Sequence, residues 1–568
     1  MRMAKKTLAF LLVFCMVAAL LPTTVLVAEA SAAGSIGKGD SIEGTDLYVT
    51  SVKNYSIAPD ITEKVIVTNN SAGISQTVAN VMEVNVSNGK AKLVTGYGNL
   101  NPSVEGWTLM TMTGQAHLYE QATNENVVGG VNASWFNIET GEPSGNLVMR
   151  GVVHKSNTSR TFIAVFSDGS VNLFKAGTSL SAALAEQKKL RGDNSLTIVE
   201  AVDGSDGILV WDGKPYTSGG NDGPYSRTAI GIKADGTVVL FQADGTMPPR
   251  SLGYDVYEEA NMMAALGCVK AIRLDEGGSS TFISQREGEA DLAMRNIPAG
   301  GSERKIAGSV LVVSTVKPTG EFDHAKITPD AEYFTPNSTI ELTATALDYS
   351  GREANAMPSD ARFVLANDGM GTIGQTTVSG KKATATFSSN GNTGDVIVNL
   401  VSENEVVGTA TVRIQNPDLL KFTSSEINLN YKQVSDLGLR ATYLTETVNL
   451  KDGDVVWEIT DESAGSFNGN LFTVTSNVKY SGSPVVTARI GELTASITVN
   501  IGMQPTMILD GGDEDIWDYS MIGTTVEDFE GMPSNAVATY HYAGRGGKVV
   551  GSVISDTQEE WADIVRFG

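Results

Sequence analysis

The order of apolar and polar residues divides the chain into a mixed first part and an all-β second part. From about residue 40 to 316, short apolar runs typical of strands are mixed with a few stretches of helical periodicity. The expected strands include Val81–Val86, Val127–Asn132, Phe162–Phe166, Thr228–Ile232 and Val238–Ala243. The expected helices are Leu180–Leu190 and Val256–Leu266. Residues 34–316 are therefore predicted to form one α+β domain with a mixed sheet.

Helical periodicity ends after residues 317–320, Lys-Pro-Thr-Gly, where we place a domain boundary. Residues 321–415 and 417–502 each contain short alternating strands separated by Gly, Asn, Asp and Ser turns, a pattern typical of a β-sandwich. The clearest of these strands are Ser338–Leu347, Ala383–Phe387, Asp395–Leu400, Gly408–Ile414, Val455–Ile459, Asn470–Val474, Pro484–Ile490 and Leu493–Ile501. Both segments resemble bacterial immunoglobulin-like modules, in which a Trp such as Trp457 packs in the core. The predicted fold class is multidomain, an α+β catalytic-type domain followed by two all-β immunoglobulin-like sandwiches.

Residues 503–568 are expected to form a partial, β-rich C-terminal module. The segment carries an acidic run from Asp510 to Asp515. This run lacks the alternating Asp/Asn ligands and the twelfth-position Glu of an EF-hand loop, so we interpret it as a solvated loop. The segment resembles the opening of a carbohydrate-binding β-sandwich, and we expect the remainder of that module to be missing from this sequence.

The N-terminal 33 residues are predicted to be a secretory signal peptide. They combine a basic start, an apolar run from Leu8 to Leu21 and the small-x-small pattern of residues 28–30. The alternative is an N-terminal membrane anchor, but the apolar run is shorter than the ~20 residues of a spanning helix. A lipid anchor at Cys15 is not expected, because Phe14 stands where lipoprotein processing requires a small residue. We therefore expect a secreted protein, extracellular or associated with the cell wall.

The content of charged residues, cysteine and histidine limits the kinds of partner and cofactor that we expect. The 568 residues include 41 Lys and Arg against 65 Asp and Glu, a formal net charge of −24, which excludes general electrostatic binding to nucleic acid. After loss of the leader the chain keeps one cysteine, Cys268, which we interpret as a buried apolar residue rather than a nucleophile. No metal or other cofactor is expected, because the four histidines, His117, His154, His324 and His541, are dispersed.

Four motifs between residues 127 and 310 carry the candidate chemistry. The first runs from Val128 to Asn137, and its Asn132 can both donate and accept hydrogen bonds at a strand end. A tight turn with a locally bonded Asn would show the same pattern. The second begins with Arg227 and Thr228 at the start of a strand. A guanidinium there suits an anionic substrate group, although a surface Arg beside an acidic patch would look the same.

The third motif follows the strand that ends at Leu274 and is the strongest of the four. Asp275 and Glu276 are followed by two glycines and three hydroxyl residues, and this combination offers a carboxylate, backbone N–H groups and hydroxyl donors at one rim. The fourth motif places Arg304 shortly before the strand of residues 309–313. The candidate substrate-binding residues are Thr228, Glu276, Gly277, Gly278, Ser279, Ser280, Thr281 and Arg304, and the candidate catalytic residues are Asp275, Arg227 and Asn132.

In this order the four motifs resemble those of the phosphodiester glycosidase family, over roughly residues 75–314. The resemblance implies hydrolysis of a sugar whose anomeric carbon is linked to a phosphate diester, with release of free sugar and a phosphomonoester. It implies further that Arg227, with Arg304, neutralises the phosphate and that Asn132 contacts a sugar hydroxyl. Asp275 would then stabilise the oxocarbenium-like centre or activate water. The substrate expected is a cell-wall or extracellular glycan.

This sequence departs from the family pattern at two places. Ala133 and Ser134 stand where the family has paired glycines, and Glu276 replaces the first glycine after the aspartate. We expect Glu276 to raise the pKa of a neighbouring carboxyl and to disfavour a phosphate placed against it.

Two alternatives stay open at this point. One is a non-catalytic surface protein that binds a glycan or a phosphate polymer, and the departures at Ala133, Ser134 and Glu276 favour it. The other is a glycosidase that acts on a neutral oligosaccharide, with Asp275 and either Glu276 or Glu142 as its carboxylate pair. We favour the phosphodiester hydrolase because four motifs agree in order.

Overall fold

The computed structural model describes residues 36–501 apart from 206, 217–222, 444–445 and 478–479, and beyond them the backbone of four further strands. The predicted signal peptide lies outside the described residues. The chain divides into two compact units, one formed by Met1–Thr319 with Asp348–Arg352 and the other by the rest. We describe each unit by itself, and the domain boundaries expected from the sequence stay predictions.

The first unit contains three β-sheets. The largest has eight strands in the order β1-β2-β3-β14-β13-β15-β11-β12. These are β1 (Leu47–Ala58), β2 (Ile61–Asn70), β3 (Thr77–Val84), β14 (Val238–Ala243), β13 (Arg227–Lys233), β15 (Cys268–Arg273), β11 (Ile208–Trp211) and β12 (Lys214–Pro215).

The other two sheets have five strands each. One has the order β17-β16-β5-β18-β4, with β17 (Ala293–Met294), β16 (Phe282–Ser284), β5 (Asn126–Asn132), β18 (Gly308–Ser314) and β4 (Ala91–Tyr97). The other has the order β7-β6-β10-β8-β9, with β7 (Val152–Lys155), β6 (Leu147–Met149), β10 (Ile198–Asp203), β8 (Phe162–Phe166) and β9 (Val171–Phe174).

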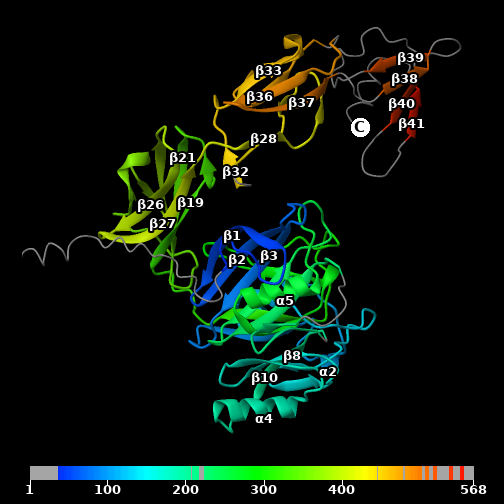
Figure 1. The fold of residues 1–568 in the computed structure, drawn as a ribbon, viewed down its shortest axis with the longest axis vertical. Coiled ribbons are helices and arrows are strands. Elements are labelled where there is room, and N and C mark those ends of the chain that lie inside the picture. Colours follow the sequence, from blue (N-terminus) through cyan, green and yellow to red (C-terminus); the bar gives the residue numbers. More distant parts are fainter. Residues whose placement is uncertain are drawn as a thin grey trace, which may run out of the picture. The chain divides into compact units, whose positions relative to one another are not determined.

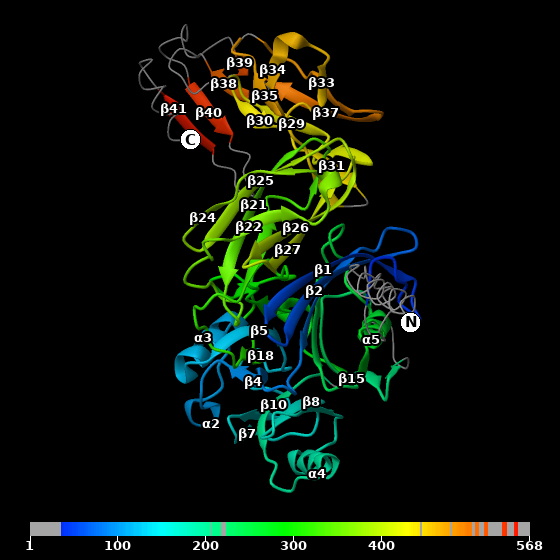
Figure 2. The same ribbon diagram turned by 90° about the vertical axis from the view of Figure 1, so that its left-hand side faces the viewer.

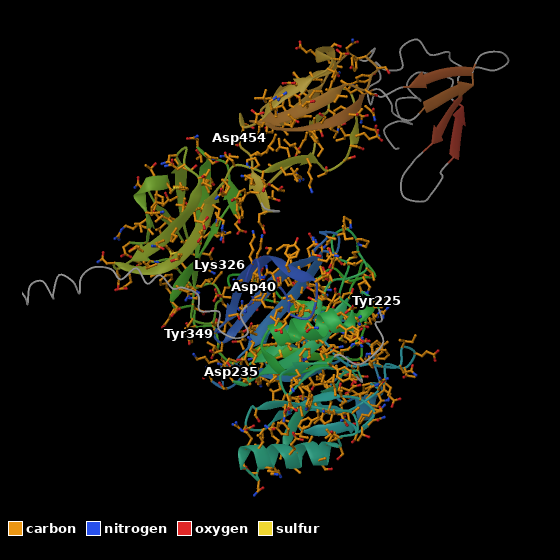
Figure 3. All side chains as sticks on the ribbon, viewed as in Figure 1. Asp40, Tyr225, Asp235, Lys326, Tyr349 and Asp454 are labelled. Atoms are coloured by element: carbon orange, nitrogen blue, oxygen red, sulfur yellow. The ribbon has the colours of Figure 1, made fainter. Side chains whose placement is uncertain are left out.

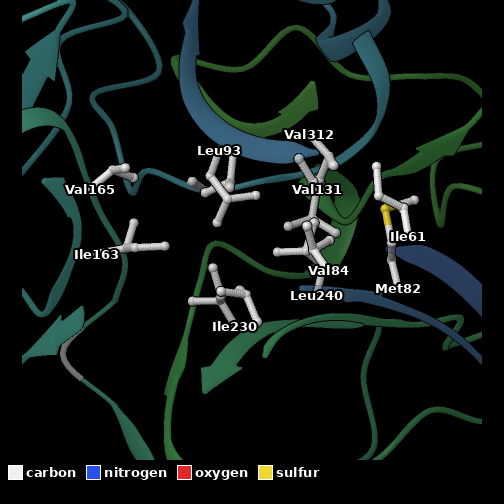
Figure 4. Close-up of a cluster of buried hydrophobic side chains, with 14 of the residues drawn as sticks. Ile61, Met82, Val84, Leu93, Val131, Ile163, Val165, Ile230, Leu240 and Val312 are labelled. Atoms are coloured by element: carbon white, nitrogen blue, oxygen red, sulfur yellow. The ribbon is translucent and has the colours of Figure 1, made fainter. Parts of the chain in front are cut away.

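One apolar cluster joins the three sheets (Figure 4). Ile230 and Leu240 come from the eight-stranded sheet, Val131 and Val312 from the sheet with β5, and Ile163 from the sheet with β8, and all are at most 2% exposed. At roughly 25 cal/mol per Å² of buried apolar surface, this shared cluster stabilises the packing of the three sheets on one another. It also fixes the strand ends that carry the four motifs.

Each sheet is covered on another face by a helix. The helix α3 (Met112–Thr123) packs on the sheet with β4, β5 and β18, and α4 (Leu180–Arg191) packs on the sheet with β8 and β10. Both ribbon views show α4 beside β8 and β10 (Figures 1 and 2). The helix α5 (Val256–Ala265) packs on the eight-stranded sheet and begins at a capping box formed by Asp255 and Glu258.

The sequence predictions for this part are confirmed for the five named strands and for the helices α4 and α5. The helix α3 and the short α2 (Pro102–Glu105) were not expected. The buried face of α3 has only three apolar residues, Met112, Ala116 and Tyr119, and a buried Gln115 interrupts the stripe. That face is too weak for recognition by periodicity. Cys268 is buried as expected, and burial raises the pKa of its thiol to about 12.

The second unit consists of β-strands and two single 3-10 turns in its described residues, η2 (Asp368–Met370) and η3 (Glu462–Ala464). Its two sheets around the first apolar core have the orders β19-β21-β25-β23, with β24 paired to β25, and β22-β26-β27-β20-β32-β31-β28. The strands are β19 (His324–Pro329), β20 (Tyr333–Phe334), β21 (Thr339–Leu347), β22 (Arg362–Leu365), β23 (Gly371–Ile373), β24 (Thr377–Ser379), β25 (Lys382–Ser389), β26 (Gly394–Ser402), β27 (Glu405–Ile414), β28 (Leu419–Phe422), β31 (Leu439–Tyr443) and β32 (Glu446–Asn449).

Two smaller sheets enclose the second core of this unit, in the orders β29-β37-β36-β33 and β30-β35-β34. Their strands are β29 (Glu426–Leu429), β30 (Val434–Asp436), β33 (Val456–Ile459), β34 (Gly465–Asn468), β35 (Leu471–Val474), β36 (Val485–Ile490) and β37 (Leu493–Ile501). Trp457 is half-buried against this core and stacks on Phe467 with ring centroids 4.4 Å apart.

The seven-stranded sheet crosses the expected joint at residues 415–417. The strand β20 pairs in parallel with β27 on one side and with β32 on the other. Strands from both expected sandwiches therefore share one sheet. The all-β character and the multidomain organisation are confirmed, while two separate immunoglobulin-like sandwiches stay a prediction.

Beyond residue 501, four strands form a further sheet in the order β39-β38-β40-β41. They are β38 (Thr506–Asp510), β39 (Ile516–Ser520), β40 (Val537–His541) and β41 (Val550–Ile554). Most of the acidic run lies at residues 511–515, outside the described residues. Across the described parts of the chain, none of the helices has the length and apolar character needed to span a bilayer.

Candidate active site

The sheet topology brings three of the four motifs together. The strands β13 and β15 pair antiparallel, with Ala229 opposite Arg273, so the start of β13 and the end of β15 share one edge. The segment after β15 leaves the eight-stranded sheet and enters β16 of a five-stranded sheet, where Phe282 pairs with Val131 of β5. We call residues 275–281 the crossing loop.

Asn132, the last residue of β5, holds both ends of the crossing loop. Its Nδ2 donates to the carbonyl of Asp275 at 2.7 Å, and its Oδ1 accepts from the backbone N–H of Thr281 at 2.9 Å. The same Oδ1 accepts from the hydroxyl of Thr228 at 2.9 Å. The side chain is fully buried. Asn132 and Thr228 thus act inside the protein as positioning residues, and the sugar contact expected for Asn132 stays a prediction.

Arg227 begins β13, and its side chain has no exposed surface. Nε donates to the carbonyl of Tyr254 at 2.7 Å, and Nη2 donates to the carbonyl of Gly223 at 2.9 Å. Nη1 donates to Oε2 of Glu276 at 2.5 Å. The guanidinium also lies 5.5 Å from the ring centre of the half-exposed Tyr225, which is labelled in Figure 3. A phosphate would reach Arg227 only after displacing Glu276, so the geometry differs from the expected phosphate clamp.

Glu276 bridges two arginines. Its Oε2 accepts from Arg227, and its Oε1 accepts from Nε of Arg273, three residues earlier. Arg273 also lies 3.8 Å from a carboxylate oxygen of the buried Glu259 on α5. Arg273 was not among the site residues expected from the sequence. The spacing of three residues between an Arg at a strand end and a Glu in the following loop was the available signal.

Asp275 is the half-buried carboxyl at the start of the crossing loop. Its pKa is raised to about 6. Burial is the largest cause and the charge of Glu276 adds to it, while the hydroxyl of Ser279, the backbone N–H of Glu276 and the charge of Arg304 oppose the shift. The expectation that Glu276 raises a neighbouring carboxyl's pKa is confirmed in direction, although burial is the larger cause. A carboxyl with this pKa exists in both protonation states near neutral pH, as acid–base chemistry requires.

Arg304 lies across the glycine turn of the crossing loop. A Cβ at Gly278 would meet the Arg304 guanidinium at 2.6–3.2 Å, so the glycine is needed for this close approach. Arg304 is exposed, and its Nη1 donates to Oγ of Ser279 at a long 3.4 Å. Of the three arginines around the loop, Arg304 presents the most open guanidinium.

The remaining residues of the turn have distinct places. Gly277 adopts a left-handed φ of 62° and donates from its N–H to the carbonyl of Ser226. The hydroxyl of Thr281 donates to the carbonyl of Ser279 and is buried. The hydroxyl of Ser280 is buried and has no hydrogen-bond partner among the described residues. The turn thus closes on itself, and only its Gly277 and Gly278 side is partly exposed.

A second buried carboxyl lies beside the first motif. Asp203 ends β10, is fully buried, and accepts from the N–H of Gly145 at 2.7 Å. Burial raises its pKa to about 7, opposed by the hydroxyl of Ser134, that N–H and the charge of Arg160. Sequence reasoning missed this residue because Asp203 is distant from the first motif along the chain.

Glu142, weighed above as a partner carboxylate, is paired elsewhere. Its Oε1 accepts from Nζ of Lys155 at 2.6 Å. Among the described residues, no group of three or more His, Cys, Asp or Glu side chains could hold a metal ion. The chemistry of the crossing loop is that of a carboxyl beside an exposed guanidinium.

A cleft of about 450 Å³ lies elsewhere in the first unit. Its walls include Tyr119, Glu125, Arg150 and Glu200, and it shares no residue with the crossing loop. Glu200 accepts from the N–H groups of Thr95 and Arg150, and burial raises its pKa to about 7. Both carboxylate oxygens thus have backbone partners, as in a structural role.

Part of the first unit is similar to known proteins. Residues 125–313 match the family model described as phosphodiester glycosidase. The mouse protein N-acetylglucosamine-1-phosphodiester alpha-N-acetylglucosaminidase is 28% identical over 172 residues, 27% of this chain and 31% of that protein. The Bacillus subtilis prophage-derived protein YomE is 27% identical over 178 residues, 30% of this chain and 26% of that protein.

Among solved structures, the catalytic domain of the zebrafish N-acetylglucosamine-1-phosphodiester alpha-N-acetylglucosaminidase covers 46% of this chain and 88% of that chain, with 16% identity and a TM-score of 0.35. The chain spans less than a third of the length of the curated mouse and Bacillus proteins that it matches. The four motifs of residues 127–310 lie inside the matched segment. Residues 125–313 of this chain are thus similar to phosphodiester glycosidases.

Proposed function

We propose that the first unit hydrolyses a sugar-1-phosphodiester in an extracellular or cell-wall glycan and releases free sugar and a phosphomonoester. The observation that carries the proposal is the approach of a cation to the loop that holds Asp275. Asp275 is a half-buried carboxyl with a pKa of about 6, and the exposed Arg304 lies across Gly278 three residues further on. A carboxyl and a cation so close together suit a reaction centre with an anionic leaving group.

In the proposed reaction, water attacks the anomeric carbon and the bond from that carbon to the phosphate oxygen breaks. The electron pair of this bond leaves with the phosphate, which Arg304 stabilises as its negative charge grows. Ionised Asp275 stabilises positive charge at the anomeric carbon and accepts the proton of the attacking water. A phosphomonoester is a good leaving group, so the reaction has little need of a strong general acid.

The remaining site residues hold this arrangement. Asn132 fixes both ends of the crossing loop, and Arg227 holds Glu276 by a hydrogen bond. Buried hydrogen-bonded networks of this kind limit the freedom of a reactive loop. The loop is then already ordered in the folded protein, before the substrate binds.

We also propose that the chain is exported and works outside the cell, with the second unit holding the first one close to its polymer substrate. The signal-peptide pattern of residues 1–33 supports export. Fractionation of expressing cells tests it. Export predicts the mature chain in the medium or wall fraction with a new N-terminus after residue 30, and retention of the intact leader in the cell would contradict it.

The decisive experiment assays the purified chain against a panel of sugar-1-phosphodiesters and against neutral aryl glycosides of the same sugars, with free sugar as the readout. We expect turnover of at least one phosphodiester and loss of that turnover in Asp275→Asn. Turnover of the aryl glycosides alone would identify a neutral glycosidase. Tight glycan binding without any released sugar would identify a binding protein.

A further inference from the structure

Glu276 takes the hydrogen bond of Arg227 that was expected to hold an anionic substrate group. The carboxylate takes hydrogen bonds from two guanidiniums, Arg227 and Arg273, and its side chain is 14% exposed. Two arginines that converge on one pair of oxygens form the geometry by which proteins recognise a phosphate. Here the protein supplies the anion itself.

The charges around the crossing loop are therefore nearly balanced before any substrate arrives. Arg227 is matched by Glu276, and Arg273 contacts Glu276 and Glu259. Arg304 is an exposed cation beside the loop, and a Cβ at Gly278 would lie within 2.6–3.2 Å of its guanidinium. This arrangement offers attraction for about one negative charge and repulsion for a second one placed near Glu276 and Asp275.

We propose that Glu276 is a specificity-determining residue that restricts the phosphate subsite to a monoanionic phosphodiester and excludes dianionic phosphomonoesters. The inference rests on the proposed function, because it refines the substrate charge of that same site. It also implies release of the product, since hydrolysis converts a monoanion into a phosphomonoester whose second charge appears above a pKa of about 6.

The test compares two small probes, dimethyl phosphate as the monoanionic diester and methyl phosphate as the monoester. Binding to the full chain is followed at pH 8 by the phosphorus NMR signal of each probe. We expect the wild-type chain to bind dimethyl phosphate about tenfold more tightly than methyl phosphate. In Glu276→Gln, which keeps the shape and removes one charge, methyl phosphate binding should strengthen by about tenfold and the preference should disappear.

Glu83→Gln is the matched control. Glu83 also bridges two cations, Lys64 at 2.7 Å and Lys233 at 2.8 Å, and is 17% exposed, but it lies within a strand rather than in the crossing loop. This variant should keep the wild-type preference. An equal change in both variants would show that the effect comes from the net charge of the protein and would overturn the inference.

A measurement on the wild-type chain protects the test if Glu276→Gln folds poorly. At pH 5 methyl phosphate is a monoanion, so its affinity relative to dimethyl phosphate should rise to about equality. Because both probes meet the same protonation state of Asp275, the ratio of their affinities isolates the charge of the probe. An affinity ratio that stays constant between pH 5 and pH 8 would overturn the inference, as would binding of neither probe.

The outcomes for the inference and for the proposed function are distinct. Turnover of a sugar-1-phosphodiester with an unchanged probe preference in Glu276→Gln would leave the function standing and remove the role of Glu276. A changed preference without turnover of any phosphodiester would support the role of Glu276 in anion binding and contradict the proposed hydrolysis.

Discussion

Two glutamates in the first unit each bridge two cations, yet their surroundings differ. Glu83 lies in the regular strand β3, and its lysine partners come from β2 and β13. Glu276 lies in the crossing loop after β15, and one of its partners is the fully buried Arg227. Burial raises the pKa of Glu83, but the hydrogen bonds and charges of its two lysines outweigh this and hold the pKa below its usual value.

An ion bridge does not by itself give a glutamate a role in binding or catalysis. The bridge at Glu83 ties strands together and has flexible, partly exposed lysines as partners. The bridge at Glu276 is held rigidly beside Asp275, whose pKa is raised, and near the exposed Arg304. Position next to a reactive carboxyl gives the second bridge its proposed function. The following experiments test that contrast in order of expected effect.

The largest effect is expected for Asp275→Asn, which keeps the shape and removes the carboxylate. Turnover of the phosphodiester should fall by about 10³-fold or more, measured as kcat. Asp235→Asn, in a hairpin turn of the same unit and labelled in Figure 3, is the control and should retain turnover. Similar losses in both variants would remove Asp275 from the site.

Arg227→Ala should destabilise the first unit strongly, because the half-buried Glu276 then loses one of its two cationic partners. We expect a loss of about 3–5 kcal/mol in the free energy of unfolding, measured by urea denaturation. Arg286→Ala is closely matched, since Arg286 also pairs with a buried glutamate, Glu63, and lies over a tyrosine ring, Tyr55.

Both arginine variants should lose stability, but only Arg227→Ala should also lose turnover per folded molecule. Full turnover by folded Arg227→Ala would show that this bridge is structural in the same sense as the one at Glu83. Replacing Lys64 by Met should cost less than Arg227→Ala, because Lys233 still pairs with Glu83 at 2.8 Å.

Arg304→Ala should lower kcat/KM for the phosphodiester by about 10²- to 10³-fold, because the variant lacks the cation that stabilises the leaving phosphate. Arg304→Lys should recover part of this loss, since an ammonium keeps the charge without the fork of donors. The melting temperature should barely change, because the side chain is exposed. Arg191→Ala, another exposed arginine with an acidic partner, is the control. Its kcat/KM should equal that of the wild-type chain, and an unaltered value in Arg304→Ala would contradict the proposed phosphate contact.

The pH dependence is the smallest expected effect. If ionised Asp275 is required, turnover should rise through a pKa of about 6 and be about tenfold lower at pH 5 than at its plateau. Stability should move in the opposite direction. The folded chain holds the proton of Asp275 more firmly than the unfolded chain, so this group makes folding less favourable as pH rises from about 4 to 6.

Asp275→Asn should therefore flatten the stability change over that interval, measured by urea denaturation at several pH values. Glu83→Gln should change the pH dependence of stability in the opposite direction. The pKa of Glu83 is lowered, so its contribution to stability is present above the usual pKa of a glutamate and disappears as pH falls. Identical pH profiles for the two variants would contradict the assigned pKa shifts.

The strands and the order of the motifs could be predicted from the sequence because both are local properties. The strand β13 was expected from its own residues, and the loop of Asp275 from the glycines and hydroxyls that follow it. The partners of these side chains could not be predicted, because they come from distant segments. Thr228 lies 96 residues from Asn132, and Arg227 lies 49 residues from Glu276.

Arg227 shows the limit most clearly. An arginine at a strand start suits a phosphate, but its actual partner depends on which anion the fold brings within reach. The sequence contained Glu276 as a departure from the family pattern, and its repulsion of phosphate was expected. That the same carboxylate would satisfy Arg227 and Arg273 required the antiparallel pairing of β13 and β15.

The two hydrogen bonds of Asn132 make the crossing loop a segment whose inner residues can be substituted. A single amide ties down both ends of the loop through the backbone carbonyl of Asp275 and the backbone N–H of Thr281, so these two bonds involve none of the loop's side chains. Substitutions inside the loop can then alter the charge presented to a ligand while the anchoring bonds stay in place. For engineering, the few residues between the two anchors form a short segment to randomise. Variants with a different substrate preference can be selected there without redesign of the surrounding sheets.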